Sequence, residues 1–185
     1  LYPDPDADDY AAIARPEDRV RLLKLLEGED AIPLFDAAPK PPKLGAYVLR
    51  SPSPRSPAMT EEIFGPILPL VPYDALDDAI AFVNGRPHPL ALYVYGRDEA
   101  VCERVVARTR SGGASINEAV LHVAAHELPF GGVGASGMGA YHGAAGFETF
   151  SHARSVFRQG RFDFTRFARP PYGAFANRLI GYLTR

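Results

Sequence analysis

The sequence predicts an α/β fold, and three observations carry that prediction. Strand and helix patterns alternate over residues 67–117, which is typical of a parallel sheet with right-handed crossovers. The composition is that of a folded globular chain, with 46% hydrophobic and 23% charged residues among 185. A formal net charge of -2 gives no basic surface for nucleic acid. The single cysteine excludes an intrachain disulfide framework and fits a reducing cytoplasm.

The first predicted element is a helix in "RPEDRVRLLKLLEG". Pro16 suits a first helical position, the acids after it favour the positive end of the helix dipole, and Gly28 ends the helix. Residues 31–58 contain seven prolines, so only a short strand near residues 46–50 is expected there.

The alternating region begins with "ILPLVPY" and continues with "LALYVYG" and "GASIN", which we predict as strands. The segments between them are predicted helices, the first capped by Asp74 and ended by Gly85. Cys102 falls inside the second helix without a recognisable activating base, so we expect a buried small side chain and no nucleophile. Near the end, "SVFRQGRFDF" predicts a short strand. The tail predicts an amphipathic helix with Phe175, Leu179, Ile180 and Leu183 on one side.

The glycine-rich segment after the third strand, residues 118–150, is the first place to look for chemistry, because ligands gather at the carboxyl ends of parallel strands. Its "GVGASG" matches the dinucleotide fingerprint in form only. Phe157 stands about 20 positions beyond Gly137, where that motif requires an acid. The glycines are better explained by tight turns and close packing. His122 and His126 lie four apart without the glutamate of a zinc-protease motif, and we expect no metal site. A serine-hydrolase elbow also fails, because Met138 replaces its last glycine.

The stretch "EEIFGP", residues 61–66, places two acids and an aromatic ring at a turn. One interpretation is two solvated acids, a core Phe64 and a Gly-Pro turn. The other is a carboxylate that binds vicinal hydroxyls beside a ring that packs on a planar heterocycle. The spacing leaves both open.

Several motifs resemble the aldehyde dehydrogenase superfamily in their order and spacing: "MTEEIFGPILPLV", "PLALYVYG", "SGGASIN", "LPFGGVGASGMGAYHG" and "FETFSHARSV". "SGMGAYHG" and "FETFSH" are similar to the class 3 and coniferyl aldehyde dehydrogenase branch. The resemblance is strong from residue 59 to about residue 157. It implies oxidation of an aldehyde to a carboxylic acid with NAD or NADP, through a thiohemiacetal on a cysteine thiolate.

The resemblance also implies roles for individual residues. Glu62 would bind the ribose hydroxyls next to the nicotinamide, and Phe64 would pack against the nicotinamide ring. Asn117, His126 and Phe130 would line the substrate site, with His126 in the loop at its entrance. His126 and Glu127 give this loop a polar rim, which favours an aromatic aldehyde, such as coniferyl aldehyde, or a medium-chain one; the alternative is that both side chains simply face water.

The expected architecture is the parallel-sheet α/β catalytic domain of this family in three parts. Residues 1–58 would supply the N-terminal helix and proline-rich segment, residues 59–150 the core with the substrate-entrance loop, and residues 151–185 an oligomerisation strand near residues 155–157 and a tail. A homodimer is the class 3 expectation.

The departures from the family pattern matter as much. The nucleophilic cysteine in its Gly-Gln-x-Cys setting, the general-base glutamate and the Rossmann domain are not found in these 185 residues. We therefore expect the C-terminal part of an aldehyde dehydrogenase, with no catalytic residue of its own and no activity alone. Its partners would be the N-terminal Rossmann portion and an aldehyde. The alternative is a stand-alone, non-catalytic remnant that serves as a binding or oligomerisation domain. A membrane-associated tail is the least favoured interpretation, because the tail is too short to span a bilayer.

Overall fold

The computed structural model describes residues 2–163, 165–166, 169–170 and 172–184. The chain forms two compact units, the first comprising Leu1–Arg86 with Ala107–Thr109 and the second comprising Pro87–Val106 with Arg110–Arg185.

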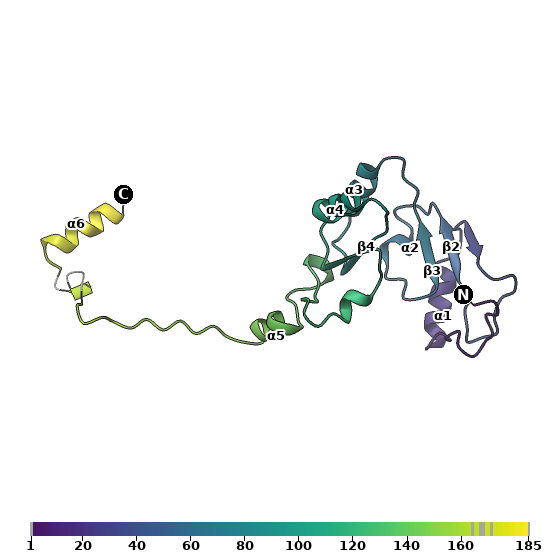
Figure 1. Cartoon of the computed structure of the whole chain (residues 1–185), viewed down its shortest axis with the longest axis horizontal. Coiled ribbons are helices and arrows are strands. Elements are labelled where there is room, and N and C mark those ends of the chain that lie inside the picture. Colours follow the sequence, from purple (N-terminus) through teal and green to yellow (C-terminus); the bar gives the residue numbers. More distant parts are fainter. Residues whose placement is uncertain (1, 164, 167–168, 171, 185) are drawn as a thin grey trace. The chain divides into compact units, whose positions relative to one another are not determined.

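The first unit packs a helix against a small sheet (Figure 1). Strand β1 is antiparallel to β2, and β2 is parallel to β3, with Tyr47 opposite Ile67. The core joins helix and sheet through Leu22, Leu25, Leu44, Leu49, Ala58 and Ile67, all buried. The elements are α1 (Pro16–Lys24), β1 (Ala31–Pro33), β2 (Tyr47–Arg50), α2 (Pro57–Thr60), β3 (Ile67–Leu70) and α3 (Leu76–Asn84).

The second unit is built on a strand–helix–strand crossover. β4 pairs in parallel with β5, with Ala91 opposite Gly113, and α4 connects them; all of α4 except its last two residues belongs to this unit. Cys102 of α4 is 1% exposed, which confirms the predicted buried side chain. The elements are β4 (Ala91–Val94), α4 (Glu99–Arg108), β5 (Gly113–Ile116), the short 3-10 helices η1 (Leu121–Val123) and η2 (Gly134–Ser136), α5 (Gly143–Thr149) and α6 (Ala174–Leu183).

The predicted helices and strands of residues 67–117 are present, and so is the C-terminal helix α6, but the single parallel sheet is a wrong expectation. β3 belongs to a three-stranded sheet with β1 and β2, whereas β4 pairs with β5 in a second sheet. The missed strand β1 lies in the proline-rich region, and its partner β2 is also the neighbour of β3. Strand pairing depends on contacts distant in sequence, which the periodicity of one segment does not report.

Two helix ends differ from the prediction. Helix α3 begins after Ala75, and no side chain caps it, so Asp74 is not its N-cap. Gly85 does end it. Helix α1 ends at Lys24, four residues before Gly28, and Gly28 instead adopts a left-handed turn conformation with φ of 76°.

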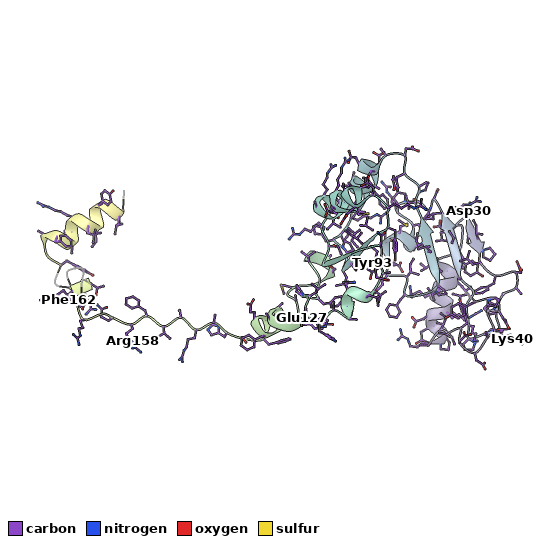
Figure 2. All side chains as sticks on the ribbon, viewed as in Figure 1. Asp30, Lys40, Tyr93, Glu127, Arg158 and Phe162 are labelled. Carbon is purple, nitrogen blue, oxygen red and sulfur yellow. The ribbon has the colours of Figure 1, made fainter. Side chains whose placement is uncertain are left out.

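Residues 151–162, which follow α5, are exposed and largely extended (Figure 1). Figure 2 shows the side chains of Arg158 and Phe162 among them; Phe162 is 79% exposed. Residues 155–157, where we expected a strand, form none in this chain, since a strand needs a hydrogen-bonded neighbour. Within the described residues, no helix has both the length and the apolar character needed to cross a bilayer.

Candidate functional site

The "EEIFGP" loop lies between α2 and β3 and rests on α1. The backbone at Gly65 approaches Leu22 so closely that an added Cβ would lie 2.5 Å from Leu22 Cδ2. Leu22 is completely buried in the core. An added methyl group would force the packed Leu22 side chain to move, so the glycine of the motif allows the loop to lie against the helix.

Phe64 projects out of the fold. Its side chain is 85% exposed, which rules out the interpretation of Phe64 as a core residue. Its backbone has φ of 47°, a left-handed conformation that is costly for a bulky residue. Strain of this kind is retained where the surrounding structure imposes it, and it is concentrated at binding and catalytic sites.

A groove of about 680 Å³ lies beside this ring. The side chains around it combine apolar, acidic and basic groups, including Ile13, Arg15, Arg21, Glu61, Glu62 and Phe64. At one edge Arg15 donates a hydrogen bond to Asp18 over 2.7 Å. That bond, followed by the charges of Asp18 and Glu17, raises the pKa of the Arg15 guanidinium. The groove therefore keeps fixed positive charge next to carboxylates.

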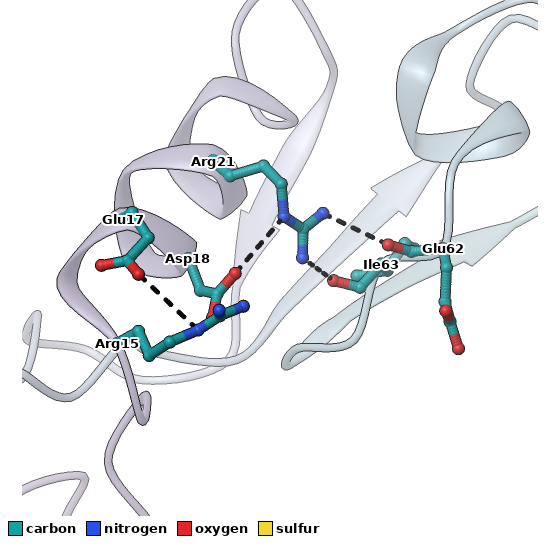
Figure 3. Close-up of polar contacts among 6 residues, drawn as sticks. All are labelled: Arg15, Glu17, Asp18, Arg21, Glu62 and Ile63. Carbon is teal, nitrogen blue, oxygen red and sulfur yellow. Dashed lines mark hydrogen bonds and ion pairs between the residues drawn. The ribbon is translucent and has the colours of Figure 1, made fainter.

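Arg21 connects helix α1 to the loop (Figure 3). Its guanidinium donates to the carbonyl oxygens of Glu62 and Ile63 over 3.2 and 2.7 Å. In Figure 3 the Glu62 carboxylate points away from Arg21, and no group in the described part of the chain hydrogen-bonds to it. A free carboxylate beside an exposed ring can accept hydrogen bonds from vicinal hydroxyls while the ring packs on a flat heterocycle, so these residues fit the ribose and base of a nicotinamide nucleotide.

In the second unit, Asn117 follows β5 and binds the chain that follows β4. Its carboxamide accepts from the Gly96 amide over 2.8 Å and donates to the Gly96 carbonyl over 2.9 Å. Its backbone N–H donates a hydrogen bond to the Val94 carbonyl over 2.7 Å, and its φ is 58°. Both ends of the side chain are thus engaged with backbone, which makes Asn117 a clamp between the ends of two strands.

Phe130 lies in a cluster of aromatic rings within the long loop. It forms a two-hydrogen-bond bridge with Tyr141, each bond 2.9 Å long. The Phe130 ring stacks on His142 at 6.1 Å, and His142 meets the ring of His126 edge-on at 5.1 Å. The predicted substrate-lining residues His126 and Phe130 are thus joined through His142, a residue that our sequence analysis did not single out.

His142 has features that would mark it as a site residue. Its φ is 79°, and its Nδ1 atom is buried with no hydrogen-bond partner among the described residues. The only sequence signal was a polar residue set among small ones in "GAYHGAAG". His122 packs between Tyr93 and Phe130 at 5.7 Å from each, so it belongs to the same ring cluster. In the part of the chain that is described, no three His, Cys, Asp or Glu side chains are placed to hold a metal ion.

The glycines of the long loop permit close backbone approach, as expected. A Cβ on Gly132 would overlap the carbonyl oxygen of Ser136, and Gly137 has φ of 151°. The Ser136 hydroxyl accepts from the Val133 amide over 2.9 Å, so it stabilises the turn.

The match to a family model is decisive. Residues 34–156 match the model of the aldehyde dehydrogenase family, which is more than half of the chain. The chain belongs to the aldehyde dehydrogenase family. It is 46% identical over 180 residues to a probable coniferyl aldehyde dehydrogenase of Pseudomonas aeruginosa, covering 95% of this chain and 38% of that protein. It is 55% identical over 102 residues to the dimeric NADP-preferring aldehyde dehydrogenase of Mus musculus, covering 55% of this chain and 22% of that one.

Solved aldehyde dehydrogenases share the fold. The substrate-bound AldH of Staphylococcus aureus superposes with a TM-score of 0.73 at 37% identity, over 96% of this chain and 39% of that one. The aldehyde dehydrogenase of Mycobacterium tuberculosis complexed with NAD+ superposes with a TM-score of 0.71 at 26% identity, over 83% of this chain and 33% of that one. The chain thus spans about two-fifths of the length of these relatives, or less. The resemblance read from the motifs is confirmed, including its coniferyl and class 3 branch.

Proposed function

We propose that this chain supplies the nicotinamide wall and the substrate-entrance loop of an NAD(P)-dependent aldehyde dehydrogenase. The observation that carries the proposal is the free Glu62 carboxylate beside the exposed Phe64 ring at one groove, with the Phe64 backbone in a left-handed conformation. Glu62 would hold the ribose hydroxyls and Phe64 the nicotinamide face. The bound cofactor would supply the hydride acceptor that aldehyde oxidation requires.

The substrate side of the proposal rests on the ring cluster of the second unit. Phe130, His126 and His142 present aromatic and polar edges, which suit an aromatic aldehyde such as coniferyl aldehyde or a medium-chain aldehyde. Asn117 would act by holding the ends of β4 and β5 in place, because its carboxamide is already engaged with Gly96.

The catalytic thiolate and general base would come from residues outside this chain. Cys102 is the one cysteine in the sequence, and at 1% exposure it cannot reach a substrate carbonyl. Loss of a covalent nucleophile abolishes its pathway outright. The assembled enzyme would be a cytoplasmic homodimer with NAD or NADP as cofactor.

The test compares two polypeptides with coniferyl aldehyde and a medium-chain aldehyde, with NAD+ or NADP+ in each case. The 185-residue chain should form no reduced cofactor, and the polypeptide encoded by the complete reading frame should form it readily. Turnover by the 185-residue chain alone would contradict the assignment of the nucleophile. An inactive complete polypeptide would favour the non-catalytic alternative.

A further inference from the structure

Helix α1 makes two different contacts with the "EEIFGP" loop, residues 61–66, through the neighbouring residues Arg21 and Leu22. Arg21 donates two hydrogen bonds to the loop, from Nη1 to the Glu62 carbonyl and from Nη2 to the Ile63 carbonyl (Figure 3). Leu22 packs against the backbone at Gly65. One side of the loop is thus held by charged hydrogen bonds and the other by core packing, although α1 precedes the loop by about 40 residues.

The orientation of Arg21 is itself supported. Its Nε lies 3.9 Å from the Asp18 carboxylate one turn earlier on α1, and Asp18 also accepts from Arg15. A guanidinium with two donors fixed on two successive carbonyls sets both the position and the tilt of that peptide, which a single hydrogen bond would not.

The choice of acceptor atoms has a consequence for binding. Arg21 bonds to carbonyl oxygens, so the Glu62 carboxylate stays free for a ligand. The same peptide leads directly into Phe64, whose left-handed backbone turns its ring outward. A loop that must hold this strained conformation needs an external restraint.

We propose that Arg21 is a positioning residue for the nicotinamide end of the cofactor. It acts through the backbone of Glu62 and Ile63, whose carbonyl oxygens accept hydrogen bonds from its two terminal nitrogens. This inference rests on the proposed function of Glu62 and Phe64. Displacements of about 1 Å in a positioning group lower rates by up to roughly a hundredfold. Loss of the two Arg21 hydrogen bonds should therefore lower kcat/KM for NAD(P)+ by about tenfold or more.

The restraint can be tested on the 185-residue chain without any activity. Chymotrypsin cleaves after exposed aromatic residues in segments that open locally. The quantity to measure by mass spectrometry is the rate of cleavage after Phe64 relative to cleavage after Phe157, an 88% exposed residue in the extended segment. Arg21→Met should raise this ratio by about fivefold to tenfold. Arg21→Lys should raise it less, because one ammonium can replace only part of the two hydrogen bonds to the Glu62 and Ile63 carbonyls.

Arg19 provides the matched control. It lies on the same helix and donates to the Lys43 carbonyl over 3.2 Å, away from the loop. Arg19→Met should leave the Phe64 ratio unchanged. An unchanged ratio in Arg21→Met, or an equal rise in Arg19→Met, would overturn the proposal.

The second readout uses the complete enzyme. Arg21→Met should raise KM for NAD(P)+ by about tenfold with a smaller change in kcat, and Arg21→Lys should recover part of the loss. A faster cut after Phe64 with unchanged KM would show that the loop is restrained but that the restraint does not serve the cofactor, and it would overturn the positioning role. If the unmutated complete enzyme forms no reduced cofactor, the proposed function fails, and the cleavage ratio still decides whether Arg21 restrains the loop.

Discussion

Residues 61–66 and residues 118–150 both carry proposed binding residues, but they are held in different ways. The shorter loop is held by side chains of one helix, Arg21 and Leu22. The longer loop is held mainly by its own backbone, through glycines in close contact and the bridge between Phe130 and Tyr141. The shorter loop thus takes its shape from residues distant in sequence, whereas the longer loop contains its own restraints.

Loss of the core residue that supports the shorter loop should destabilise the chain most. Leu22→Ala removes a fully buried side chain that also contacts Gly65, so it should lower the free energy of unfolding by about 3 kcal/mol. Val20→Ala, on the same helix but 53% exposed, should change it by less than about 0.5 kcal/mol. Urea unfolding followed by circular dichroism measures both. Equal losses would show that α1 is not anchored through Leu22.

The longer loop should be destabilised by a substitution that displaces its backbone. Gly132→Ala places a methyl group against the Ser136 carbonyl and should cost about 2 kcal/mol, because backbone atoms must move. Gly160→Ala, where an added Cβ meets nothing within 4 Å, is the control and should be neutral. Thermal unfolding of the two variants checks this. A neutral Gly132→Ala would contradict the description of a backbone-restrained loop.

Two substitutions of Asn117, just before the longer loop, distinguish the stabilisation from its side-chain hydrogen bonds from that due to its backbone conformation. Asn117→Gly keeps easy access to φ near 58° but loses both bonds to Gly96, so it should cost about 1 to 2 kcal/mol. Asn117→Ala loses the bonds and also the tolerance for this conformation, so it should cost about 1 kcal/mol more. If the two variants were equally stable, the positive φ would contribute nothing.

Phe64 should show the smallest effect on stability. Phe64→Ala should change the free energy of unfolding by less than about 0.5 kcal/mol, since the ring is 85% exposed. Phe64→Gly relieves the left-handed strain and should be neutral or up to about 1 kcal/mol more stable. Chemical denaturation of the two variants decides, and a clear loss with Phe64→Ala would mean that the ring serves the fold.

The sequence predicted elements with strong local patterns and missed features that depend on distant partners. Helices α1, α3 and α4, strands β3 to β5 and buried Cys102 follow from hydrophobic spacing and turn residues. Strand β1 and the division into two sheets depend on pairing between separated segments.

The candidate site divides in the same way. Glu62 and Phe64 could be picked out because an unusual motif carries them, and both lie at the groove beside α1. Their roles toward the cofactor stay a prediction. Arg21 could not, because an arginine on a charged helix face has no local feature that reports two carbonyl partners in a loop 41 and 42 residues away. His142 was missed because its significance lies in its φ and in the rings around it.

The role of the Glu62 carboxylate can be measured by comparing the steady-state kinetics of Glu62→Gln and Glu61→Gln in the complete enzyme. The two acids are neighbours with the same chemistry, but only Glu62 is proposed to hold the ribose. Glu62→Gln should raise KM for NAD(P)+ or lower kcat/KM by about tenfold to a hundredfold, since it removes a charged hydrogen-bond acceptor, while Glu61→Gln stays within about twofold of the unmutated enzyme. Equal effects of the two substitutions, or none from Glu62→Gln, would contradict the assignment of this loop to the cofactor.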